Sequence, residues 1–173
     1  PGEGRNHFII LGVDAMKTIL MTGAAGGVAT FLRRELVEYN LRLSDVRVVA
    51  DLSDNETFVA SDLTDLEAVM AAAEGCDGII HLGGMSDEQS WEDILNANIV
   101  GCHNVYEAAR TQGVKRVIFA SSNHAVGFYR RDETISVDVT TKPDTRYGVS
   151  KAFGEAMGSL YADKYGVGGL AIR

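Results

Sequence analysis

Short apolar runs alternate with amphipathic segments along this chain, and this alternation constrains the fold more than any other feature. We expect strands at 17–23, 45–51, 76–84, 115–121 and 169–173. Apolar residues recur at helical spacing between them, which predicts helices at 26–40, 63–75, 90–113 and 147–166. Strands that alternate with helices form a parallel sheet with helices on both faces. Right-handed crossovers then favour an α/β doubly wound parallel sheet, a Rossmann fold, with strand order 3-2-1-4-5.

Two details refine this prediction. We expect Thr64 to cap the second helix and Gly75 to end it. The short segment before Ser61 is compatible with one more strand. The long third helix carries one apolar face, formed by Ile94, Leu95, Asn98, Cys102, Val105, Tyr106 and Ala109.

Charge and composition exclude some classes of partner. The net charge is −8 and the acidic residues are scattered, which argues against nucleic acid or an anionic membrane as a partner. Cys76 and Cys102 lie in apolar settings, which indicates reduced core thiols in a cytoplasmic protein. The apolar stretch at 8–13 is too short to span a membrane.

The chain divides into two parts. Residues 1–15 precede Met16 and the periodic pattern, so we expect them to be a tag or another non-native extension. Residues 16–173 should form the Rossmann domain. The chain stops inside the predicted fifth strand, where a complete doubly wound domain usually continues to a sixth, so we expect either a fragment or a minimal fold.

A glycine-rich turn joins the first predicted strand to the first predicted helix. Gly23, Gly26 and Gly27 permit a tight turn there, and the helix N-terminus that follows suits a pyrophosphate. Asp51 is expected at the tip of the second strand, where a carboxylate accepts bonds from a ribose diol and repels a 2′-phosphate. No arginine follows Asp51 directly, so the pattern favours NAD over NADP. The alternatives are an ordinary structural turn and a solvated strand-end aspartate.

Polar residues gather where the later elements begin. Ser121, Ser122, Asn123 and His124 directly follow the fourth predicted strand, at the edge where doubly wound sheets bind ligands. Tyr147 and Lys151 are four residues apart on one face of the last helix. A lysine ammonium close to a tyrosine hydroxyl favours the phenolate, which makes such a pair a general base. A chance Y-x-x-x-K spacing remains the alternative.

Taken together, these motifs resemble the extended short-chain dehydrogenases/reductases, the NAD-dependent epimerase/dehydratase family. The matching pieces are TGAAGG, Asp51, Asp62–Leu63, CDGIIHLGG, NIVGCHNVYEAAR, VIFASSNHAVG and YGVSK, in the order that the family has them. Within the family, HLGGMSDEQSWEDILNANI and FASSNHAVGFY resemble the uronate dehydrogenases. That group oxidises glucuronate or galacturonate at C1 to the aldarolactone.

The resemblance implies roles for individual residues. The catalytic residues would be Ser122, Tyr147 and Lys151. The residues that bind NAD would be Gly23, Ala25, Gly26, Gly27, Val28, Asp51, Leu52, Asp62, Leu63, Leu82, Gly83, Gly84, Asn98, Tyr147 and Lys151. The residues that bind the substrate would be Ser86, Ser122, Asn123, His124 and Tyr147.

Plainer alternatives stay open for several of these residues. Asp62 suits either an adenine edge or a helix N-terminus. Asn98, which the resemblance makes a support for the lysine through a water, could instead be a polar residue tucked into a helix interface. His124 could be a hydrogen-bonded loop histidine, and no ligand cluster accompanies it that would suit a metal. For Ser121 a structural role is favoured.

The resemblance therefore predicts an NAD-dependent oxidoreductase of carbohydrate metabolism that acts on a small sugar acid and forms homo-oligomers. The alternatives are a nucleotide-sugar epimerase or dehydratase of the same family and a non-catalytic, truncated NAD-binding module. Two departures from the family stand out. Ala29 replaces the third glycine of the turn. The family's segment after the fifth strand, which supplies most of the sugar pocket and an arginine for the substrate carboxylate, is absent.

Overall fold

The computed structural model describes residues 16–173. Residues 1–15, which we expect to be an extension, lie outside the described part. Six parallel strands form one sheet: β1 (Thr18–Thr22), β2 (Asn40–Asp45), β3 (Glu56–Ala60), β4 (Gly78–His81), β5 (Arg116–Ala120) and β6 (Gly168–Ile172). Their order is β3-β2-β1-β4-β5-β6, which confirms the doubly wound Rossmann sheet with order 3-2-1-4-5. The predicted strand at 169–173 is β6, and the strand added to the five predicted ones is β3, the short segment before Ser61.

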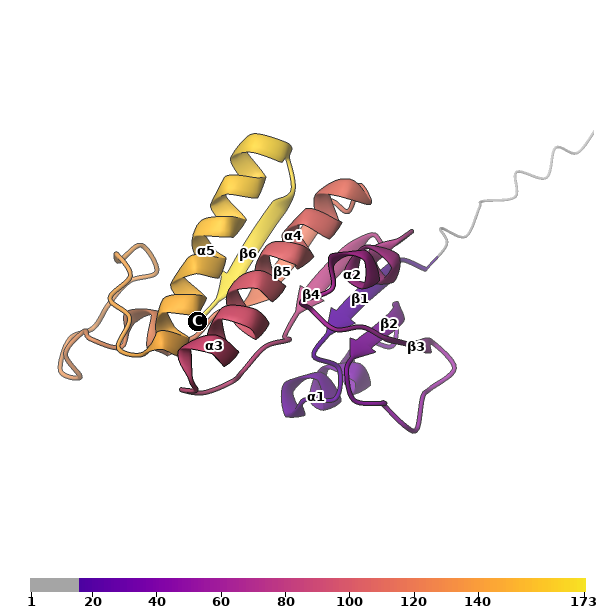
Figure 1. Ribbon diagram of the computed structural model, residues 1–173, viewed down its shortest axis with the longest axis horizontal. Helices are drawn as coiled ribbons and strands as arrows, with labels where there is room; N and C mark the ends of the chain where they lie inside the picture. The colour runs from indigo at the N-terminus through magenta and orange to yellow at the C-terminus, as the bar shows by residue number, and fades with distance from the viewer. Residues whose placement is uncertain (1–15) are drawn as a thin grey trace, which may run out of the picture.

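Helices cover both faces of the sheet (Figure 1). They are α1 (Gly27–Glu35), α2 (Leu66–Ala73), α3 (Trp91–Ile94), α4 (Gly101–Thr111) and α5 (Arg146–Tyr165). A π-helical turn, η1 (Leu95–Val100), joins α3 to α4, and a 3₁₀ turn, η2 (Asn123–Val126), follows β5. None of the described helices is long and apolar enough to cross a membrane.

The core consists of two apolar layers because strand side chains alternate between the two faces. Leu20 belongs to the layer under α2, α4 and α5, and its neighbour Met21 belongs to the layer under α1. Over β5 and β6, the second face is exposed: Ile118, Leu170 and Ile172 are 37%, 58% and 54% accessible.

Register brings the strand ends together at one edge. Thr22, the last residue of β1, pairs with Ser44 in β2 and with His81 at the end of β4. The loops that leave these strands therefore converge at the carboxyl edge of the sheet. The strand order reverses there, between β1 and β4. In doubly wound sheets this is where ligands bind.

The second strand lies five residues earlier than we predicted. It spans Asn40–Asp45, and the predicted segment 46–51 is a loop in which Val46 and Val48 are largely exposed. The prediction relied on the three-residue apolar run at 48–50. In the observed strand, apolar and polar residues alternate, and Leu41 and Leu43 are buried.

The cap of α2 also differs from the prediction. Asp65, not Thr64, is the N-cap, and its carboxylate accepts the Ala68 N–H at 3.1 Å. The Thr64 hydroxyl instead donates to Asp62 Oδ1 at 2.8 Å. The predicted stop is confirmed in its position, since Gly75 has φ +69° just after the helix.

Candidate active site

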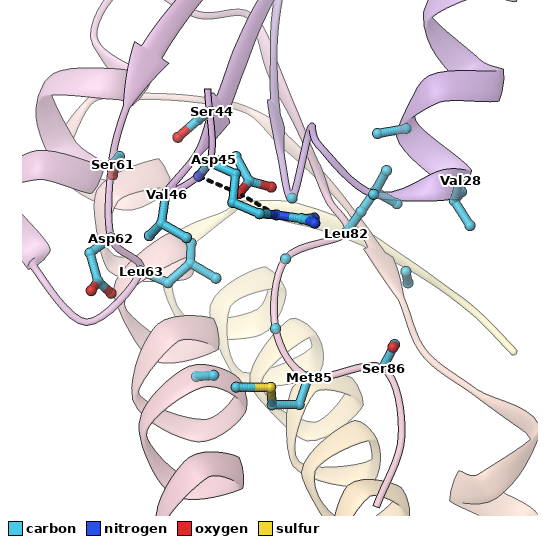
Figure 2. A pocket seen from close by; sticks show the side chains of 18 of the residues that line it. Val28, Ser44, Asp45, Val46, Ser61, Asp62, Leu63, Leu82, Met85 and Ser86 are labelled. Carbon is cyan, nitrogen blue, oxygen red and sulfur yellow. Dashed lines mark hydrogen bonds and ion pairs between the residues drawn. The ribbon is translucent and has the colours of Figure 1, made fainter. Parts of the chain in front are cut away.

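A cavity of about 710 Å³ lies at the carboxyl edge of the sheet, between the ends of β1, β2, β4 and β5 and the first turn of α5. Eleven of the residues that we predicted to bind the cofactor line it: Gly23, Gly26, Gly27, Val28, Asp62, Leu63, Leu82, Gly83, Gly84, Tyr147 and Lys151. Figure 2 shows Asp62 and Leu63 on one side of the cavity and Val28 on the other, with Leu82 between them.

The glycine turn after β1 brings two backbone segments close together. Gly23 has φ +69°, and a Cβ on it would lie 2.6 Å from the backbone nitrogen of Gly83. The helix α1 then starts at Gly27, and its N-cap, Gly26, offers no side chain to the free N–H groups of the first turn. The space where a Cβ of Gly27 would stand is open for 4 Å. This arrangement fits an anion such as a pyrophosphate at the helix N-terminus.

Asp45, rather than Asp51, occupies the tip of β2. Its carboxylate accepts the N–H groups of Ala25 at 3.0 Å and Arg47 at 2.9 Å. Asp51 lies in the exposed loop before β3 with φ 56°, outside the cavity lining, and so does its neighbour Leu52. The placement of Asp51 at a strand tip was therefore wrong, because the strand itself ends at Asp45.

Residues after β3 form the far wall of the cavity. Asp62 accepts both the N–H and the hydroxyl of Thr64 through Oδ1, so it does cap the turn that leads into α2, and it also lines the cavity. The Ser61 Oγ is buried and has no hydrogen-bond partner among the described residues. Leu63 packs against Gly83, where a Cβ would come within 2.7 Å of its side chain. The Ser61 hydroxyl could bind the polar edge of a nucleotide base, and the Leu63 side chain could pack against the face of the base.

The end of β4 is fixed by buried polar contacts. Thr22 Oγ1 and His81 Nδ1 are 2.7 Å apart, and complete burial lowers the pKa of His81 to about 3, so the imidazole is neutral. Asn98, on the π-helical turn, accepts the Met85 N–H at 2.7 Å and donates to the Met85 carbonyl and to Ser150 Oγ. Asn98 thus lies under the turn that leaves β4, outside the cavity lining, and its bond to Ser150 joins η1 to α5.

Tyr147 and Lys151 lie on the same side of α5, and both line the cavity. The Lys151 Nζ donates to the Ala120 carbonyl at 2.8 Å and lies 5.4 Å from the centroid of the Tyr147 ring. Burial lowers the pKa of Lys151 to about 8, so its ammonium form still predominates at neutral pH. A cation is therefore held between the end of β5 and the tyrosine of the next helix.

The polar stretch after β5 folds into the 3₁₀ turn η2. Ser122 is its N-cap and accepts the His124 N–H at 3.1 Å, while its hydroxyl donates to Asn123 Oδ1 at 3.2 Å. The His124 ring stands edge-on to the Tyr147 ring, with the centroids 5.7 Å apart. Ser121 donates to Glu155 at 2.6 Å, which suits the structural role expected for it, but it also lines the cavity.

The predicted substrate residues fall into two groups. Ser86 and Tyr147 line the cavity, whereas Ser122, the N-cap of η2, and Asn123 and His124 within η2 are not part of its lining. Two predicted cofactor residues besides the Asp51–Leu52 pair also fall outside the lining, Ala25 and Asn98. The prediction missed lining residues that sit at strand ends or in the turns after them, namely Ser44, Asp45, Val46, Arg47, Ser61, Met85 and Ala120. The alternation of apolar residues at Leu41 and Leu43 could have placed the end of this strand at Asp45. That would have brought the missed residues 44–47 to the edge of the sheet.

Fold and site together define a dinucleotide-binding domain with a tyrosine–lysine pair at the ligand edge. Residues 19–173 match the NAD dependent epimerase/dehydratase family, and the chain belongs to that family. The family's dependence on NAD agrees with the predicted cofactor, although the choice of NAD over NADP had rested on Asp51, which lies outside the cavity lining.

Uronate dehydrogenases are prominent among the similar proteins. The uronate dehydrogenase of Pseudomonas syringae pv. tomato is 50% identical over 158 residues, which are 90% of this chain and 58% of that protein. The solved structure of a mutated uronate dehydrogenase superposes with a TM-score of 0.89 at 49% identity, over 91% of this chain and 58% of that one. A mutant of the Agrobacterium tumefaciens enzyme complexed with NAD gives 0.86 at 46% identity, over 90% and 59%. The chain thus spans less than two thirds of these relatives.

Proposed function

We propose that this site oxidises a uronic acid, glucuronate or galacturonate, at C1 to the aldarolactone with NAD as the oxidant. The observation that carries the proposal is the placement of Tyr147 and Lys151 on one wall of the cavity, beside the serine-containing turn after β5. Similarity to uronate dehydrogenases over 90% of the chain supports the choice of substrate class.

We assign each part of the NAD molecule to a different wall of the cavity. The glycine turn and the N-terminus of α1 hold the pyrophosphate, and Asp45 accepts bonds from the adenosine ribose. Asp62 and Leu63 bound the space for the adenine. NAD, when bound, supplies the hydride acceptor for the reaction.

Three side chains handle the substrate oxygen. Tyr147, as the phenolate, takes the proton of the anomeric hydroxyl as the C1 hydrogen leaves with its electron pair, which turns the hemiacetal into a lactone. Lys151 stabilises the phenolate through its positive charge. Ser122 donates to the same oxygen and orients it toward Tyr147.

The sugar lies beyond Tyr147, between two polar segments. Ser86 follows the glycines after β4, and Asn123 and His124 belong to the turn after β5. We assign these three side chains to the sugar hydroxyls and the carboxylate end of the substrate.

A substrate panel separates this proposal from its rivals. The chain is incubated with NAD and glucuronate, galacturonate or a set of nucleotide sugars, while NADH absorbance is followed and sugar products are resolved by chromatography. NADH formed with the free uronates supports the proposal. Conversion of a nucleotide sugar instead supports an epimerase or dehydratase, and NAD binding by calorimetry without turnover supports a non-catalytic module.

We also propose that copies of the chain associate through the exposed apolar face of β5 and β6. Ile118, Leu170 and Ile172 project from it into solvent, and exposed apolar sheet faces and open edges favour association. Elution of the chain as a monomer at micromolar concentration in size-exclusion chromatography with light scattering would contradict this.

A further inference from the structure

His124 is tied to Asp144, in the short segment before α5, by two contacts. Its ring Nδ1 lies 2.8 Å from Asp144 Oδ1, and its carbonyl accepts the Asp144 N–H at 3.4 Å. The Thr145 hydroxyl donates to the same Asp144 oxygen at 3.3 Å. Asp144 therefore contacts the histidine through both backbone and side chain.

Two glycines allow this contact to be close. A Cβ on Gly127 would collide with the Asp144 carboxylate, and a Cβ on Gly148 would collide with the His124 carbonyl. The carboxylate thus rests on the backbone of the turn after β5, and the first turn of α5 rests on the backbone of His124. Packing on both sides restricts where the ring and the carboxylate can go.

The charge state of Asp144 decides which ring nitrogen carries hydrogen. The hydrogen bond from His124 holds the pKa of Asp144 below its ordinary value, so the carboxyl group is ionised at neutral pH. An ionised carboxylate only accepts hydrogen bonds. The nitrogen that faces it, Nδ1, must then be the one that bears the proton, and in neutral imidazole the other nitrogen is an acceptor.

We infer that Asp144 is a positioning residue that fixes His124 as the Nδ1–H tautomer and leaves Nε2 free to accept a hydrogen bond from a substrate hydroxyl. The centroid of the His124 ring lies 5.7 Å from that of Tyr147, so the histidine stands beside the residue proposed as the base. The inference rests on the proposed function for the identity of the hydroxyl, which belongs to a uronic acid. It assigns His124 to a hydroxyl rather than to the substrate carboxylate, because a lone pair repels a carboxylate.

The tautomer is measured without substrate. Long-range ¹H–¹⁵N spectra of the chain are recorded at about pH 9, well above the ordinary imidazole pKa, and a His124→Gln variant identifies the signals of this ring. We expect Nδ1 to show the shift of a protonated nitrogen and Nε2 that of an unprotonated one. In Asp144→Ala the signals should move toward the Nε2–H form that predominates in unconstrained histidine. Asp138→Ala removes an exposed carboxylate from the same loop and should change nothing.

Two results would overturn the inference. The first is an Nε2–H tautomer in the unaltered chain, which decides the matter even if the variant fails to fold. The second comes from kinetics with glucuronate: Asp144→Ala should raise its KM about tenfold while the KM for NAD stays within twofold, and an unchanged KM for glucuronate would contradict the positioning role. If no uronate is turned over, the proposed function fails while the tautomer result still stands.

Discussion

The Nζ of Lys151 lies 5.4 Å from the centroid of the Tyr147 ring and donates its hydrogen bond to the carbonyl at the end of β5. One helical turn separates the two residues, so both face the cavity. The strand end thus anchors the cation at a fixed place above the tyrosine ring. The pair is assembled by the fold itself, from α5 and β5.

Burial of Lys151 makes the stability of the chain depend on pH. The folded state releases the lysine proton at about pH 8, whereas the unfolded chain holds it up to the ordinary value of 10.5. Between these values the unfolded state binds more protons, so the free energy of unfolding rises with pH, by roughly 3 kcal/mol for this residue. Urea unfolding of the unaltered chain and of Lys151→Met at pH 7 and pH 10 measures this contribution.

The unaltered chain should gain stability over Lys151→Met as the pH rises, because the variant lacks the buried lysine whose pKa is lowered in the folded state. A difference between the two proteins that stays constant from pH 7 to pH 10 would mean that the lysine is solvated in the folded state.

Gly23 is expected to tolerate no side chain. Gly23 and Gly75 share φ +69°, but a Cβ on Gly75 meets no atom within 4 Å, whereas one on Gly23 would strike the backbone of Gly83. Gly75→Ala should cost about 1 kcal/mol of unfolding free energy through its left-handed backbone alone. Gly23→Ala should cost about 3 kcal/mol or more and weaken NAD binding.

Chemical denaturation of the two alanine variants compares them directly. Equal losses of stability would show that the approach of the β1 turn to Gly83 is not close in solution.

Asp45 should determine how well the site binds NAD. Asp45→Asn keeps the side-chain shape but removes the charge that a ribose diol binds and a 2′-phosphate avoids. We expect the Kd for NAD to rise about tenfold, or about 1.4 kcal/mol, and the Kd for NADP to fall. Asp51→Asn is the matched control and should leave both unchanged, because Asp51 lies in an exposed loop and is not part of the cavity lining. Calorimetric titration measures both Kd values. A loss of NAD affinity in the Asp51 variant rather than in the Asp45 variant would mean that Asp51, not Asp45, binds the ribose.

The sequence predicted best the strands whose residues form an uninterrupted apolar run. The strands at β1, β4 and β5 are continuous apolar runs that end in glycine or polar residues, and they lie where we expected them. The second strand failed because Asn40 and Arg42 interrupt its apolar residues, and the Arg42 guanidinium leaves the sheet to bind the Ala72 carbonyl at the end of α2. That long-range contact makes a charged residue acceptable inside a strand, and no local pattern encodes it.

For the site, the limits of prediction follow the same division. The glycine turn and the tyrosine–lysine spacing are local patterns, so Gly23, Tyr147 and Lys151 were placed at the cavity from the sequence. Residues whose place depends on a strand end were missed when that end was misplaced, as with Asp45 and Arg47. The contact between His124 and Asp144 joins residues 20 apart through an irregular loop, which sequence periodicity does not reach.

Replacement of the Tyr147 hydroxyl tests the central claim most directly. Tyr147→Phe retains the ring that packs against His124 and removes only the group that takes the proton. NADH formation from glucuronate should fall at least a thousandfold, within the range expected for a general base, while calorimetry should give a Kd for NAD within about threefold of that of the unaltered chain. Turnover that survives the substitution, or a loss of NAD binding that parallels the loss of turnover, would contradict the role of Tyr147 as the base.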